Sequence, residues 1–78
     1  HAGYRVYACL DGRVAVAALE PHFALALCQA AGIENVDRNT MMAKETQESI
    51  ARFLAGQTMQ KLNVLAVKRD IPMLTLRD

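Results

Sequence analysis

The fold is decided by residues 4–19, which read YRVYACLDGRVAVAAL. Along residues 4–10, and again along residues 13–19, successive side chains fall alternately on two faces of an extended chain, so each segment predicts a β-strand. Asp11-Gly12 lies between them and favours the positive φ angles of a tight primed turn, so the stretch predicts a β-hairpin. The second strand is apolar on both faces, which is typical of a strand that is covered on both sides.

A helix is expected directly after the hairpin. Pro21 suits a first helical turn because proline has no N–H to leave unpaired, and Gly32 is typical of a helix stop. In the predicted helix of about residues 21–31, only His22 and Gln29 are polar. A helix this apolar must be buried on most of its sides.

The second half of the chain predicts two more helices. Thr40 can cap a helix of about residues 41–55, which Gly56 ends. Thr58 can cap a third helix that runs to about residue 68, because apolar residues recur there at helical spacing.

The last predicted element is a strand over residues 73–76. Asp70 and Pro72 end the third helix and lead into this strand, which has to reach the hairpin across the helices. The element order is therefore β-β-α-α-α-β. We predict an α+β fold in which the hairpin and the C-terminal strand form a three-stranded antiparallel sheet packed with three helices.

Composition limits what the chain can be. Its 78 residues allow a single small domain, residues 1–78, and exclude a two-domain enzyme within this sequence. The chain is 53% hydrophobic and carries a net charge of +1 with no block of like charge. These values exclude a disordered tail and disfavour a nucleic-acid surface. No apolar run approaches the roughly 20 residues of a membrane helix, so we expect a cytoplasmic protein.

The residues that could bind a metal or attack a substrate are few. Two cysteines, Cys9 and Cys28, and two histidines, His1 and His22, do not have the spacing of a zinc site, so no metal is expected. Both cysteines lie in apolar runs and are interpreted as buried thiols, with a single disulfide between them as the alternative. The sequence has no phosphate-binding loop, no nucleophile elbow and no Cys/His pairing typical of a nucleophile.

Five short motifs, taken together, say more about the chain than its composition does. In chain order they are Tyr-Arg-Val-Tyr at 4–7, Asp-Gly-Arg at 11–13, Ala-Leu-Glu-Pro at 18–21, His-Phe at 22–23 and Ala-Gly-Ile at 31–33. This set resembles the small domain of the family III CoA transferases, the group that includes α-methylacyl-CoA racemase. Later residues also resemble that domain's remaining helices and its return strand, although the matched residues there are common ones.

The resemblance implies an enzyme that transfers CoA between carboxylic acids, or inverts the centre next to an acyl-CoA thioester. Such enzymes are interlocked homodimers whose large domains hold the CoA. We therefore expect the chain to be a fragment of a larger two-domain enzyme. Its partners would be a large domain of the same protein, a second subunit and acyl-CoA. The isolated chain is expected to bind no cofactor and to be inactive.

Glu20 is the one site residue that the resemblance assigns. In the racemase branch the glutamate of the Ala-Leu-Glu-Pro motif supports a catalytic histidine. A carboxylate at the start of a helix is also favoured by the helix dipole alone, by about 0.3–1 kcal/mol. His22, on the polar stripe of the first helix, is expected to face solvent or a domain boundary. Two other readings stay open: a free-standing interaction module that docks through its first helix, and a small-ligand carrier.

Overall fold

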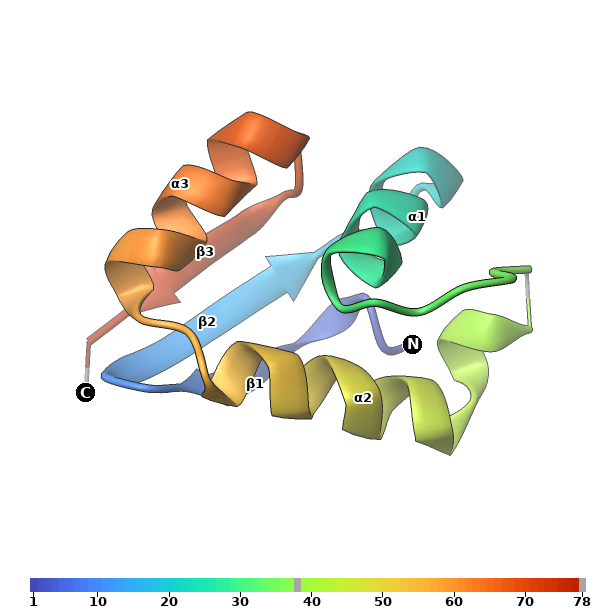
Figure 1. Cartoon of the computed structure of the whole chain (residues 1–78), viewed down its shortest axis with the longest axis horizontal. Helices are drawn as coiled ribbons and strands as arrows, with labels where there is room; N and C mark the ends of the chain where they lie inside the picture. The colour runs from blue at the N-terminus through green and yellow to red at the C-terminus, as the bar shows by residue number, and fades with distance from the viewer. Residues whose placement is uncertain (38, 78) are drawn as a thin grey trace.

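The computed structural model describes residues 1–37 and 39–77, and Figure 1 shows the arrangement of their elements. The strands are β1 (Tyr4–Cys9), β2 (Gly12–Ala17) and β3 (Met73–Leu76). The helices are α1 (Pro21–Ala30), α2 (Lys44–Ala55) and α3 (Met59–Arg69), and a short 3-10 helix, η1 (Thr40–Met42), precedes α2. The predicted α+β fold and the order β-β-α-α-α-β are confirmed.

The three strands form one antiparallel sheet in the order β1-β2-β3, so the C-terminal strand joins the hairpin along β2. Pairing of Tyr4 with Ala17 fixes the register of β1, and pairing of Arg13 with Leu76 fixes that of β3. The helices α1, α2 and α3 lie on one face of this sheet, in front of it in Figure 1. The domain therefore has two layers, one of helices and one of strands.

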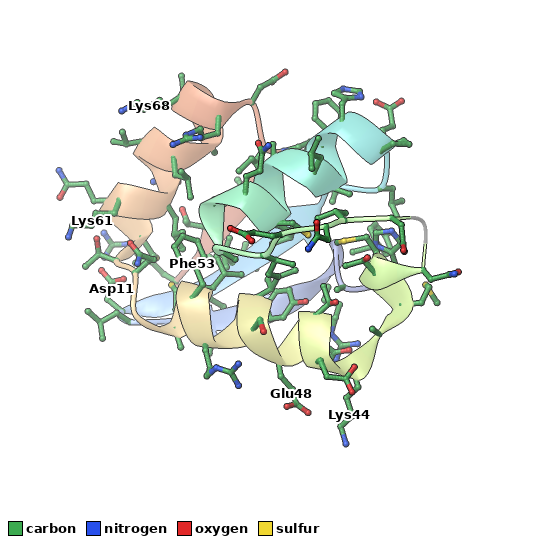
Figure 2. The ribbon with its side chains drawn as sticks, turned by 45° about the vertical axis from the view of Figure 1, so that its right-hand side comes forward. Asp11, Lys44, Glu48, Phe53, Lys61 and Lys68 are labelled. Carbon is green, nitrogen blue, oxygen red and sulfur yellow. The ribbon has the colours of Figure 1, made fainter. Side chains whose placement is uncertain are left out.

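The core lies between these two layers. Val14 and Val16 of β2 point into it and are 0% and 3% exposed. The helices contribute fully buried aliphatic side chains, which are Leu27, Ile50, Leu54 and Leu62. Figure 2 shows Phe53 on the inner side of α2, while Lys44 and Glu48 point outward. The helix α2 thus packs its apolar side on the core and exposes its charged side.

The hairpin turn lies one residue earlier than the sequence predicted. Cys9 pairs with Gly12, so the two loop residues are Leu10 and Asp11, and Gly12 is already the first residue of β2. In the described residues positive φ occurs at Gly32, Asn35 and Asp70, so the predicted primed turn is wrong. Glycine is needed at position 12 for another reason: a Cβ there would lie 2.7 Å from the backbone oxygen of Leu76.

The carboxylate of Asp11 has a long-range role that the turn motif concealed. Its Oδ1 accepts a hydrogen bond from the backbone N–H of Met59, the first residue of α3, at 2.7 Å. Figure 2 shows Asp11 beside the first turn of α3, near Lys61. The backbone N–H of Leu10 also donates to the backbone oxygen of Gln57, at 2.8 Å. The hairpin tip therefore caps α3, together with Thr58, whose hydroxyl accepts from Lys61 N–H as predicted.

The second predicted helix begins later than expected, at Lys44, and Thr40 does not cap it. Ala43 is extended, with φ −77° and ψ 139°, and separates α2 from η1. The reason lies in Asp37, whose carboxylate accepts hydrogen bonds from both the backbone N–H and the hydroxyl of Thr40. Thr40 therefore belongs to a separate turn, which brings Met41 into the core.

One face of the sheet is not covered by this chain. Tyr4, Val6 and Leu74 point away from the helices and are 61%, 54% and 65% exposed. The expectation that β2 is covered on both sides is wrong for the described residues, because all three helices pack on the same face. The helix α1 buries Ala24, Leu27 and Cys28, partly buries Phe23, Ala26 and Ala30, and leaves Leu25 as its exposed leucine.

Candidate functional site

Glu20 lies in the short connection between β2 and α1. It occupies the position before Pro21 with φ −69° and ψ 144°, and its backbone oxygen accepts a hydrogen bond from Ala24 N–H at 2.9 Å. Within the described residues its carboxylate makes no cap hydrogen bond to the helix. The backbone of Glu20 therefore starts α1, while its side chain is left available for another partner.

The nearest charged partner of Glu20 is His22. Its Nε2 lies 3.8 Å from Oε2 of Glu20, and both side chains are 66% exposed. The imidazole of His22 also packs on the ring of Phe23, with the ring centroids 4.0 Å apart. An exposed pair at this distance contributes little to stability.

The structure confirms that His22 faces solvent, but sequence reasoning missed its contact with Glu20. Two side chains on either side of a proline at a helix start are not brought together by helical periodicity, so no pattern in the sequence indicated this pair. The signal available was only their closeness in the chain.

An apolar groove lies next to this pair. Its volume is about 400 Å³, and its lining includes Leu19 and Pro21, which flank Glu20 in the sequence, together with Leu25. Asp37 and His1 also line this groove. Hydrogen bonds from Asn39 N–H and from Thr40 lower the pKa of the Asp37 carboxyl. The groove is therefore mostly apolar, with one carboxylate and one imidazole among its lining side chains.

The buried ionisable groups are structural. Tyr7 donates a hydrogen bond to the backbone oxygen of Ala2, and burial raises the pKa of its phenol. Cys9 and Cys28 are both buried and free, so the prediction of buried thiols is confirmed. Burial raises the pKa of the Cys28 thiol, whose sulfur lies 3.3 Å from that of Met41. Neither cysteine has the exposure that is typical of a nucleophilic thiol.

The part of the chain that the structure describes has neither a metal-binding cluster nor a membrane-spanning helix. No three His, Cys, Asp or Glu side chains there come together in a way that could hold a metal ion. Across residues 1–37 and 39–77, none of the helices has both the length and the apolar character needed to cross a membrane.

The chain is thus a small α+β domain with the exposed carboxylate of Glu20 at a strand-to-helix junction. Its affiliation follows from its sequence as a whole. The chain belongs to CoA-transferase family III, whose family model matches residues 1–78. No curated protein matches the chain closely enough to count as a relative.

The family assignment fixes the chemistry in broad terms. Proteins of this family use CoA thioesters as substrates. The roles of Glu20 and of the neighbouring groove are not tested by this assignment and stay predictions.

Proposed function

We propose that this chain is the small domain of a larger acyl-CoA enzyme, which transfers CoA between carboxylic acids or racemises 2-methylacyl-CoA. The small domain covers the active site, and a large domain of the same protein provides the nucleophile or the groups that move protons. The observation that carries this proposal is the carboxylate of Glu20, exposed at the start of α1 without a cap hydrogen bond.

Glu20 would act as a positioning residue for a histidine of the large domain. A carboxylate that accepts a hydrogen bond from one imidazole nitrogen fixes the tautomer, and the other nitrogen is then free to take a proton. In a racemisation that proton leaves the carbon next to the thioester carbonyl, and a second acid returns a proton on the opposite face. The loose contact with His22 supports this role, because docking can exchange it for the new partner.

The partners follow from the same proposal. They are the large domain, a second subunit of a homodimer and an acyl-CoA whose thioester lies near Glu20, while CoA itself is held by the large domain. The two free thiols support a cytoplasmic location, because disulfides rarely persist there.

The test is Glu20→Gln in the intact parent enzyme. We expect at least a tenfold loss of turnover, which corresponds to about 1.4 kcal/mol of barrier, with an unchanged melting temperature. Glu45→Gln is the matched control, because Glu45 is an exposed glutamate near the start of another helix, in the first turn of α2. Full activity of the Glu20 variant, with a small drop in melting temperature, would reduce Glu20 to a helix-end residue.

The competing proposal is a free-standing interaction module, which the exposed apolar face of the sheet favours. Both proposals expect the isolated 78-residue chain to leave acyl-CoA unchanged, because Glu20 has no nucleophile beside it. The coding sequence around these residues distinguishes them, because a longer reading frame on both sides would support the enzyme and a start codon directly before His1 would support the module.

A further inference from the structure

The groove beside Glu20 has an apolar floor and exposed aliphatic side chains around it. Ala24 of α1 and Met41 of η1 lie deepest, since they are 5% and 4% exposed. Leu19, just before α1, and Leu25, within it, also line the groove but are 52% and 43% exposed. The volume of about 400 Å³ is in the range of small-molecule sites. An apolar ligand would therefore remove two leucines from water.

The two ionisable side chains among the described residues that line the groove are already hydrogen-bonded. The carboxylate of Asp37 accepts from Asn39 N–H at 2.8 Å and from Thr40 N–H at 3.0 Å. The Nδ1 atom of His1 accepts from Gly3 N–H at 2.9 Å. An apolar group that enters the groove takes no hydrogen-bond partner from these atoms, so it does not incur the cost of leaving them unpaired.

We propose that this groove binds the acyl chain of the substrate and that the chain is apolar. The inference rests on the proposed function, because that function places the thioester near Glu20. Leu19 and Pro21 flank Glu20 in the sequence and both line the groove. Consecutive Cα atoms are only about 3.8 Å apart, so a chain that leaves a thioester beside Glu20 reaches the groove within its first few carbons. Every CoA thioester, the substrate class of this family, carries such an acyl group.

The volume of the groove indicates the length of the acyl chain. A methylene group is close in size to a water molecule, which takes roughly 30 Å³, so the groove has room for about ten carbons. A short polar acyl group would leave most of the apolar lining in water. Each methylene that enters should therefore raise kcat/KM of the parent enzyme about two- to fourfold.

The dependence of kcat/KM on chain length in the parent enzyme tests this inference. The long and short probes are 2-methyloctanoyl-CoA and 2-methylbutanoyl-CoA for a racemase, or octanoyl-CoA and butanoyl-CoA for a transferase. Leu25→Trp fills the groove and should lower kcat/KM at least tenfold for the long probe and less than about twofold for the short one. Val64→Trp is the matched control, because Val64 lies on α3 and is 61% exposed, and it should behave like the wild type. Equal losses for both probes in Leu25→Trp would overturn the inference.

A second measurement needs neither the parent enzyme nor a variant. In the 78-residue chain, a methyl NMR titration with octanoyl-CoA should shift the signals of Ala24, Leu25 and Val36. We expect a dissociation constant of about 1 mM, because eight carbons supply little affinity. Acetyl-CoA, which has the same CoA part, should leave these signals in place. The inference is wrong if octanoyl-CoA at about 5 mM shifts none of them, or shifts Val6 and Leu74 on the open sheet face instead.

Failure of this inference and failure of the proposed role of Glu20 give different results. Full activity of Glu20→Gln, together with a loss of chain-length preference in Leu25→Trp, would remove the role of Glu20 and retain the groove. A large loss of turnover in Glu20→Gln, with unchanged chain-length preference in Leu25→Trp, would retain Glu20 and remove the groove.

Discussion

The two faces of the sheet are built from the same strands and are similarly apolar, yet one is covered and the other is bare. On the covered face Val14 and Val16 are buried, and on the bare face Val6 is 54% exposed. The difference is not in the strands but in where the helices pack. An apolar side chain on a strand therefore does not reveal whether its own chain covers it.

The largest difference in unfolding free energy between variants on the two faces is expected for leucines. Leu62→Ala on the covered side should lower the free energy of unfolding by about 2–5 kcal/mol, because it leaves a cavity in the core. Leu74→Ala on the bare face should change it by less than about 0.5 kcal/mol, since that side chain is already largely in water. Urea unfolding measures both values, and equal losses would show that the bare face is buried in solution.

The two tyrosines of β1 sharpen the comparison. Tyr7→Phe should cost about 1–3 kcal/mol, because the buried backbone oxygen of Ala2 loses its donor. Tyr4→Phe is the matched control on the bare face and should change stability little.

Tyr7 also predicts that the stability of the domain depends on pH. Burial raises the pKa of Tyr7, with Arg5 partly opposing this effect and Cys28 adding to it. The phenol's contribution to stability is therefore complete below its unfolded pKa of about 10 and is lost as the pH rises through the higher folded value. Unfolding measured from pH 8 to 11 should show this loss in the wild type but a smaller one in Tyr7→Phe. Equal alkaline losses in both would contradict it.

The smallest loss of stability is expected at Asp11, which lies at the hairpin tip and on neither face of the sheet. Asp11→Ala should cost about 1 kcal/mol, because it removes the acceptor for Met59 N–H at the start of α3. Asp11→Asn keeps an oxygen acceptor and should retain most of that stability. Chemical denaturation of the two variants tests this, and equal losses would assign the effect to the charge of Asp11 rather than to the hydrogen bond.

The order of elements could be predicted from sequence because each has a local signal: alternation in the strands, Pro21 at the start of α1, and Thr58 at the start of α3. The turn could not, because Asp-Gly is the signature of one turn type, whereas here both residues are used for contacts with α3. The start of α2 could not be predicted, because the reciprocal hydrogen bonds of Asp37 and Thr40 make Thr40 part of a separate turn before α2.

The candidate site, too, could be predicted from the sequence only in part. Glu20 could be singled out because a linked set of motifs surrounds it, and the family assignment agrees with that set. Its contact with His22 was missed because helical spacing does not bring together two side chains on either side of a proline. The groove was missed because it depends on how Val36 and Asp37 fold against α1.

The hydrogen bond between the hairpin tip and α3 also bears on how fast the domain folds. Asp11 and Met59 are 48 residues apart in the sequence, and the pairing of β2 with β3 spans still more of the chain. A hairpin and single helices form within about microseconds, but closing such long loops has an entropic cost that must be met before these contacts form. We therefore expect the domain's folding rate to depend more on the meeting of its two ends than on the formation of its local elements.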